Sequence, residues 1–298
     1  MGQQVPVDSS ARADDPRRDD ARDDNTHEIA PDLAYRRLAI VNAMLVGLPG
    51  AGDRQWVLVD TGIMGTKQLI TSAVKERFGN SRPAAIILTH AHFDHVNALD
   101  EFSEEWDAPV YAHQLELPYL DGSASYPPPD PSVGGGLMAR MSPLFPRGPF
   151  NAGPRVRALP ADGTVPHMPG WRWIATPGHS PGHVSFWRES DRALIAGDAF
   201  VTTAQESVYA ALTQETEIHG PPMYYTIDWD AARRSVQTLA QLQPELAVTG
   251  HGRPLRGPQL RSGLERLARD FDSIAVPDDG RYGKKPARAE DGSAYRTP

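Results

Sequence analysis

Short apolar runs and longer amphipathic segments alternate along most of the chain. The short runs are bounded by glycine, proline or polar residues, which is typical of buried strands, whereas the longer segments repeat their apolar residues at helical spacing. The pattern predicts two hairpins, at 36–62 and 183–198, further strands at 84–90, 108–113, 170–179 and 245–252, and helices at 65–79, 97–106, 228–242 and 257–274. Because strands and helices alternate within each half of the chain, we expect an α/β fold of the α+β kind, with two sheets covered by helices.

Three segments depart from this alternation. Residues 1–28 carry many charges of both signs and little apolar content, which predicts a disordered, charged N-terminal tail. Residues 121–170 contain 11 prolines and 8 glycines in 50 positions, which predicts a long excursion over the surface. Residues 277–298 are again polar and are expected to form a loose C-terminal tail, so one folded catalytic domain is predicted over 29–276.

Composition and charge narrow the choice of partner. The formal net charge of −8 provides no positive field for nucleic acid or an anionic membrane. No apolar run approaches the ~18 residues of a membrane span, and the amino terminus lacks the apolar core of a signal peptide. We therefore expect a small-molecule substrate, no nucleic acid and no membrane as partner, and a cytoplasmic location; the sequence does not determine the oligomeric state.

Three of the ten histidines fall within six positions of the stretch "LTHAHFDHVNA" (88–98), directly after a predicted buried strand. Alternate side chains of an extended segment point the same way, so His90 and His92 can converge on one metal ion. Asp94 and His95 follow where the chain turns toward the next helix, and they can serve a second ion nearby. Since the chain has no cysteine, any such metal must be held by nitrogen and oxygen.

Three further candidates share this local plan. His179 in "TPGHSPGH", Asp198 in "AGD" and His251 in "TGHG" each follow an apolar strand and lie beside glycine. Strand ends fix the positions of ligands, and glycine lets the backbone bend close to an ion. Imidazole and carboxylate ligands without sulfur suit Zn²⁺, and also Fe²⁺ or Mn²⁺.

These motifs resemble the metallo-β-lactamase superfamily over about residues 36–256. The resemblance rests on the H-x-H-x-D-H signature at 90–95, on the three later candidates, and on Asp60 in the upstream "VDTG". It implies the metallo-β-lactamase fold, an αββα sandwich of two mixed β-sheets flanked by helices. It also implies two divalent metal ions, with zinc as the expected metal and iron or manganese as the alternatives. By resemblance, the first ion is bound by His90, His92 and His179, the second by Asp94, His95 and His251, and both by Asp198.

The resemblance further implies a metal-dependent hydrolase. A metal-bridging hydroxide would cleave an ester, lactone or thioester of a small molecule, with Asp94 and Asp198 as the catalytic residues because either carboxylate can relay the proton. Asp60 would orient a ligand histidine from behind. The stretch "TPGHSPGHVSF" looks most like the glyoxalase II and acyl-homoserine-lactonase branch, whereas the presence of Asp198 and the absence of cysteine argue against β-lactam hydrolysis.

Two other functions fit the same motifs. A mononuclear iron dioxygenase acting on glutathione persulfide would use only His90, His179 and Asp198. A non-catalytic metal-binding module of the same fold would keep the ligands without turnover. Other polar residues have simpler interpretations: a structural hydrogen bond for His183, packing rather than oxyanion donation for Tyr209, Tyr224 and Tyr225, and structural or surface roles for His113, His167 and His219.

Overall fold

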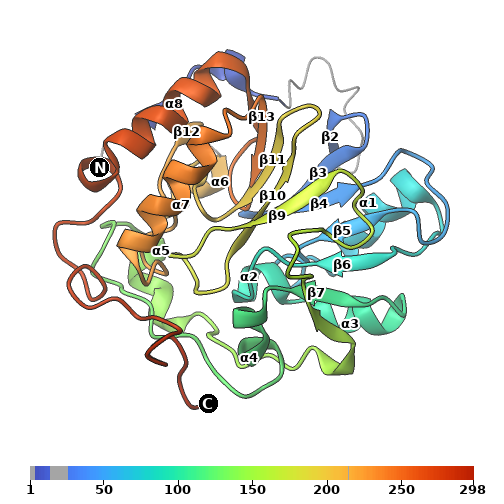
Figure 1. Cartoon of the computed structure of the whole chain (residues 1–298), viewed down its shortest axis with the longest axis horizontal. Coiled ribbons are helices and arrows are strands. Elements are labelled where there is room, and N and C mark those ends of the chain that lie inside the picture. The colour runs from blue at the N-terminus through green and yellow to red at the C-terminus, as the bar shows by residue number, and fades with distance from the viewer. Residues whose placement is uncertain (1–3, 14–25, 214) are drawn as a thin grey trace.

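Two stacked mixed β-sheets form the centre of the computed structural model, which describes residues 4–13, 26–213 and 215–298 (Figure 1). Within these residues the larger sheet has the strand order β2-β3-β4-β5-β6-β7-β8, with bounds Thr26–Ala30, Leu33–Leu38, Val41–Val46, Val57–Val59, Ala85–Ile87, Val110–Ala112 and Val156–Ala158. The smaller sheet has the order β14-β13-β11-β10-β9, with bounds Leu255–Arg256, Leu246–Thr249, Ala193–Gly197, Val184–Arg188 and Trp171–Ala175. Antiparallel and parallel pairings occur in both sheets.

Strand alternation explains how the two sheets stack. In β5, Val57 and Val59 face the core between the sheets, whereas Leu58 between them faces the outer core of the larger sheet. In β11, Ile195 contributes to the same central core and Leu194 to the outer core of the smaller sheet. Because successive side chains of a strand point to opposite faces, an entirely apolar strand needs cover on both sides.

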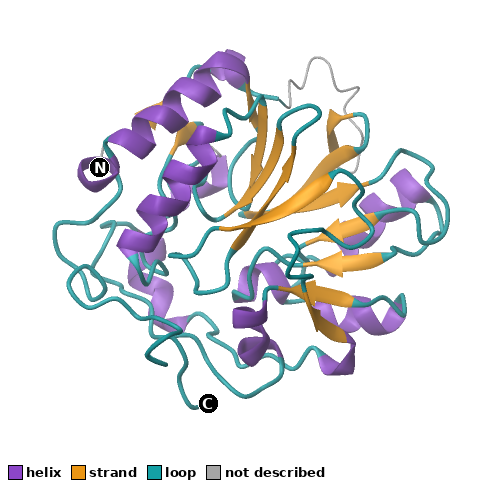
Figure 2. Ribbon diagram, viewed as in Figure 1, coloured by secondary structure: helices purple, strands orange, loops and turns teal. Residues whose placement is uncertain are grey.

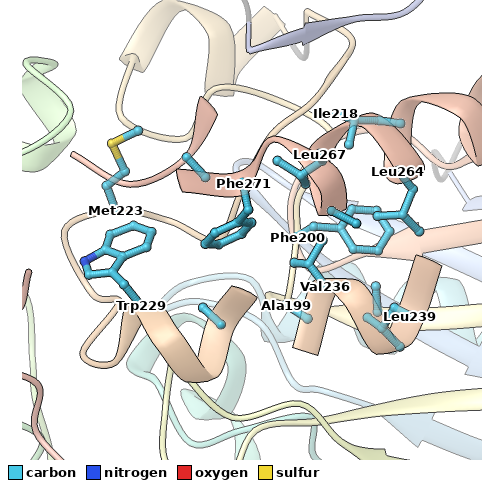
Figure 3. Close-up of a cluster of buried hydrophobic side chains, with 14 of the residues drawn as sticks. Ala199, Phe200, Ile218, Met223, Trp229, Val236, Leu239, Leu264, Leu267 and Phe271 are labelled. Carbon is cyan, nitrogen blue, oxygen red and sulfur yellow. The ribbon is translucent and has the colours of Figure 1, made fainter. Parts of the chain in front are cut away.

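Helices supply that cover (Figure 2). The larger sheet is covered by α1 (Lys67–Phe78) and α3 (Leu99–Glu105), and the smaller sheet by α7 (Trp229–Gln241) and α8 (Gly257–Arg269). Figure 3 shows Val236 and Leu239 of α7 and Leu264 and Leu267 of α8 packed around Phe200. The predicted αββα sandwich is therefore confirmed. The remaining helices are α2 (Phe93–Val96), α4 (Leu117–Leu120), α5 (Leu137–Met141), α6 (Val208–Thr213) and α9 (Phe271–Ile274).

Most predicted elements occur where the pattern placed them, with local differences. Gly79 ends α1 as expected, with φ 67° and its N–H donating to the Lys75 carbonyl, but Leu69 is 38% exposed rather than on the buried face. The predicted hairpin at 36–62 is three strands, because the chain reverses at Ala39, whose φ is 62°. No glycine or proline marks that turn, so the apolar pattern runs through it.

The amino-terminal prediction is wrong for the described part of the segment 1–28. Strand β1 (Val5–Pro6) pairs with β12 (Glu217–Ile218), Ala11 is buried in the outer core of the smaller sheet, and β2 begins at Thr26. A few apolar residues bury enough surface here to order a segment whose composition is dominated by charge. Residues 1–3 and 14–25 of the predicted tail lie outside the described residues.

The predicted C-terminal tail and surface excursion also differ from the structure. Residues 277–298 run across the molecule as irregular chain, with Tyr282, Ala287 and Ala294 buried, so they are not loose. The excursion 121–170 contains β8, which pairs with β7 in the larger sheet, and the fully buried Tyr126. Proline and glycine restrict hydrogen-bonded regular structure, but they leave side chains free to pack. Among the residues that the structure describes, no helix is both long enough and apolar enough to span a bilayer.

Candidate metal centre

Seven predicted ligand residues come together at the ends of strands from both sheets. His90, His92, Asp94 and His95 follow β6, and the others follow β9, β11 and β13 of the smaller sheet. Strands β9, β11 and β13 run in the same direction, so their carboxyl ends lie at one edge of the sheet. All seven side chains are buried, and Asp94, at 7%, is the most exposed.

The cluster divides into overlapping groups of three. Within each group, one potential ligand atom per residue lies within 4.8 Å of the others: His90 with His92 and His179, His90 with His95 and Asp198, and Asp94 with His95 and His251. In the first group the Nδ1 of His92 is 2.9 Å from the Nε2 of His179. Side-chain nitrogens this close, in a buried place, are arranged to face a common point.

Asp198 lies between the two sets of histidines. Its Oδ2 is 3.5 Å from His179 Nε2, 3.6 Å from His95 Nε2 and 3.1 Å from His251 Nε2. Ligand atoms around a tetrahedral zinc ion with bonds of about 2.0–2.1 Å are about 3.3 Å apart. One carboxylate thus lies at ligand spacing from histidines of both sets.

Each of four histidines is held through its other ring nitrogen. His95 Nδ1 contacts Asp60 Oδ2 at 2.8 Å, and His251 Nδ1 donates to the Ile40 carbonyl at 2.6 Å. His179 Nδ1 is 3.4 Å from Thr226 Oγ1, and His90 Nδ1 is 3.0 Å from the hydroxyl of Thr89. Fixing one nitrogen in this way sets the ring orientation and leaves Nε2 as the ligand atom.

Asp60 connects both sets from behind. Its Oδ1 accepts from the Thr89 backbone N–H at 2.9 Å, and its Oδ2 accepts from the Thr89 hydroxyl at 2.8 Å as well as from His95. The Thr89 hydroxyl is then an acceptor toward His90 Nδ1. Asp60 therefore orients His95 directly and His90 through Thr89.

The electrostatics of the two sets differ. Burial lowers the pKa of His90 and His92 well below the ordinary value, and lowers that of His179 to about 3. Burial alone would also lower the pKa of His95 and of His251, but the Asp198 carboxylate outweighs it and raises both. The first three imidazoles are consequently neutral at pH 7, with a lone pair available for a cation, whereas a metal bound by His95 and His251 would displace protons.

Asp198 is ionised despite its burial. Desolvation raises its pKa, but His251 and His95 outweigh that effect and hold the pKa well below the usual range. Within the described residues, His90 Nε2, His95 Nε2 and Asp198 Oδ1 are buried without a hydrogen-bond partner. Because an unpaired buried polar atom costs free energy, these three atoms fit a site where bound cations would supply the missing partners.

Glycine and His183 shape the centre from its rear. A Cβ on Gly250 would overlap Asp198 Oδ1 and lie 2.8 Å from His95 Cε1, so only glycine fits there. His183 donates from Nδ1 to Thr176 Oγ1 at 2.8 Å, and its Nε2 accepts the Asp198 backbone N–H at 2.8 Å. The structural hydrogen bond predicted for His183 is confirmed, and it fixes the backbone of Asp198.

The other candidates divide between the centre and the periphery. The Tyr225 ring stacks on His92 with centroids 4.6 Å apart, and its buried hydroxyl has no hydrogen-bond partner among the described residues. Tyr209, by contrast, is 72% exposed on α6. His113 packs edge-on against Trp173, and His219 forms an ion pair with Glu206 in another part of the fold, as expected of structural residues.

Sequence reasoning missed Glu116 and Tyr126. Glu116 is fully buried beside the centre, and Tyr126 lies against His92, with ring centroids 4.3 Å apart. Glu116 belongs to an ordinary amphipathic stretch, and Tyr126 to the proline-rich excursion, so neither has a local signal. Glu116 is revealed only by the four hydrogen-bond donors around its buried carboxylate, and those donors come from distant segments.

Two stacked mixed sheets that gather five histidines and two aspartates at their strand ends define a metal-binding αββα protein. A family model described as the metallo-beta-lactamase superfamily matches residues 36–251. A protein of Bacillus subtilis named probable metallo-hydrolase YflN is 46% identical over 236 residues, which cover 79% of this chain and 89% of that protein. The chain belongs to the metallo-β-lactamase superfamily, whose fold implies divalent metal binding, and its histidine and aspartate clusters are arranged to hold such a metal.

Two further similarities are more distant. A hydroxyacylglutathione hydrolase of Bdellovibrio bacteriovorus is 28% identical over 118 residues, which cover 39% of this chain and 34% of that enzyme. The crystal structure of a β-lactamase domain protein from Burkholderia ambifaria matches with a TM-score of 0.60 at 20% identity, and the match covers 87% of this chain and 77% of that chain. The structural match shows the fold alone, while the relatives named as hydrolases support a metallo-hydrolase.

Proposed function

We propose that this protein is a dinuclear metal-dependent hydrolase that cleaves an ester, lactone or thioester of a small molecule. The observation that carries the proposal is the position of Asp198, whose Oδ2 lies within 3.6 Å of histidines from both sets. A mononuclear site needs no carboxylate placed in this way. Seven converging ligand residues are enough to hold two ions, and a set of imidazoles and carboxylates suits zinc.

The proposed ligands follow the geometry of the three groups. His90, His92 and His179 would hold the first ion, and Asp94, His95 and His251 the second, with Asp198 shared between them. When bound, such ions lower the pKa of a water molecule to about 7, which provides hydroxide, and polarise a substrate carbonyl. The remaining chemistry belongs to side chains of this protein.

Asp94 and Asp198 are the proposed proton carriers. Asp198 is held rigidly from behind through His183 and from the side through His251, so its carboxylate keeps one position. Asp94 is the most exposed of the seven residues and its Oδ2 lies 3.5 Å from His251 Nε2, so we assign its side of the centre as the side that substrate reaches. A carboxylate there can take up a proton and pass it to the leaving group.

An aromatic surface borders the centre on that side. Phe93 packs against Phe145 of the excursion with ring centroids 5.4 Å apart, and against Tyr225 at 6.3 Å. These aromatic surroundings fit an apolar acyl group or ring. The excursion 121–170 thus contributes to the choice of a small-molecule substrate, and the net charge of −8 favours neither nucleic acid nor a membrane as partner.

The test combines metal analysis with a substrate panel. We expect two divalent ions per chain, and hydrolysis of at least one lactone, thioester or carboxylic ester that stops on chelation and returns with Zn²⁺. The hydroxyacylglutathione hydrolase similarity supports including glutathione thioesters in the panel. A single iron with oxygen uptake on a persulfide would instead establish the dioxygenase, and full metal occupancy without turnover would establish a binding module.

A further inference from the structure

The buried carboxylate of Glu116 joins the two segments that carry the proposed first-ion ligands. Its Oε1 accepts from Ser180 Oγ at 2.8 Å and from the Gly182 backbone N–H at 2.7 Å. Its Oε2 accepts from the Ala91 backbone N–H at 3.0 Å and from the Tyr126 hydroxyl. One oxygen therefore holds the turn that contains His179, and the other holds the segment that contains His90 and His92.

Two of the residues that donate these hydrogen bonds lie next to proposed ligands in the sequence. Ala91 lies between His90 and His92, and Ser180 directly follows His179. The two segments come from different sheets, since the first follows β6 and the second follows β9. Glu116 is thus the side chain through which the two ends of the first-ion set are tied together across the sandwich.

The surroundings of Glu116 are built to admit a carboxylate. Its four donors are neutral groups, its side chain is fully buried, and burial raises its pKa. A Cβ on Gly182 would lie 2.8 Å from Glu116 Cγ and 2.9 Å from Oε1, so glycine at 182 is what allows the carboxylate to approach. A buried carboxylate without hydrogen bonds would cost folding free energy, whereas this carboxylate accepts four hydrogen bonds.

We propose that Glu116 is a positioning residue that sets the spacing of His179 from His90 and His92, and thereby the affinity of the first metal position. The inference rests on the proposed dinuclear function. Each oxygen of Glu116 accepts from one hydroxyl, which can reverse its bond, and from one backbone N–H, which cannot. A glutamine at 116 has only one oxygen, so it leaves the N–H of either Ala91 or Gly182 facing an NH₂ group.

The experiment measures metal binding rather than turnover. Metal-free protein is titrated with Co²⁺ and Zn²⁺ against a competing chelator, and the Co²⁺ absorption spectrum reports ligand geometry. We expect Glu116→Gln to weaken binding of the ion at the first position 10- to 100-fold, the usual effect of losing an outer contact of a metal site. Gly182→Ala, which keeps the Glu116 carboxylate but displaces it, should weaken binding of the same ion.

Glu206→Gln is the matched control, because Glu206 is a buried glutamate that accepts the Met223 backbone N–H at 2.7 Å and lies 3.2 Å from His219, and neither partner adjoins a proposed ligand in the sequence. It should lower the melting temperature without changing either metal affinity. If Glu116→Gln folds and binds both ions like the wild type, Glu116 has no positioning role, although the hydrolase proposal stands. If the wild type binds two ions but hydrolyses nothing, the hydrolase proposal fails while the affinity change still supports Glu116. Wild-type protein that binds no ion would overturn both.

Discussion

Asp60→Asn tests how the histidines are oriented. The φ of Asp60 is 62°, a left-handed conformation that asparagine also adopts readily, so the backbone tolerates the change. If the asparagine oxygen keeps its bond to the Thr89 N–H, the NH₂ group faces His95 Nδ1. His95 must then carry its proton on Nε2, the nitrogen that faces Asp198 and that should bind the metal.

The alternative orientation of the asparagine is no better. An NH₂ group toward the Thr89 N–H leaves two donors facing each other in a buried place, which costs about 1–3 kcal/mol. We therefore expect the second ion to bind 10- to 100-fold more weakly, equivalent to about 1.4–2.7 kcal/mol. The first ion should weaken less, because Asp60 reaches His90 only through Thr89.

The assay is a two-site competition titration with Co²⁺ and Zn²⁺ on metal-free protein. Thr89→Val is the matched variant, because it removes the relay to His90 and leaves the Asp60–His95 contact in place. Asp130→Asn, a change at another buried aspartate, controls for general destabilisation. Wild-type affinity at both positions in Asp60→Asn would refute the view that tautomer and ring orientation are set by Asp60.

Three further predictions follow from the packing and the charges. Gly250→Ala should lower metal content measured by mass spectrometry at least tenfold, because the new methyl group overlaps Asp198. Leu264→Ala should lower the free energy of unfolding in urea by about 2–5 kcal/mol, because that side chain is fully buried between helices and sheet. Burial alone would lower the pKa of His219, but Glu206 at 3.2 Å outweighs it and raises the pKa to about 9. That contribution to stability is complete below pH 6.5 and is lost as the pH rises to 9, so wild type should lose up to about 3 kcal/mol more than His219→Gln over this range.

The controls for these variants are exposed or open positions. Leu137→Ala, at a leucine that is 56% exposed, should change stability by well under 1 kcal/mol. Gly283→Ala should leave metal content unchanged, since the nearest atom to its Cβ would be 3.7 Å away. Equal pH dependence of unfolding in wild type and His219→Gln would contradict the ion pair, and full metal content in Gly250→Ala would contradict the close approach at Asp198.

Much of the centre could be predicted because its signals are local. His90, His92 and His179 lie next to apolar strands and glycines in short stretches, so the strand ends alone indicate where ligands can converge. Gly79 and the N-cap Asp228, whose side chain accepts the Ala231 N–H at 3.0 Å, likewise marked helix ends correctly.

What could not be predicted depends on contacts between distant segments. Glu116 meets Ala91 and Gly182 only after the two sheets stack, and nothing in its own neighbourhood reveals this. Val5 is similarly hidden in a charged segment, and is buried only because β12 lies beside it. Composition describes the average of a segment, whereas the structure of the segment depends on the few side chains that contact distant parts of the chain.

The shared carboxylate of Asp198 has a thermodynamic consequence for anyone who titrates this protein. In the proposed dinuclear site, an ion at either position shares the charge of the one carboxylate that the other position also uses, so the two binding equilibria are linked through a coupling free energy. Because the coupling is reciprocal, the factor by which the first ion changes the affinity for the second equals the factor by which the second changes the affinity for the first. Macroscopic dissociation constants of the wild type would therefore describe the loading sequence of the proposed pair, and assigning each constant to one set of histidines requires variants that disturb a single set, such as Asp60→Asn and Thr89→Val.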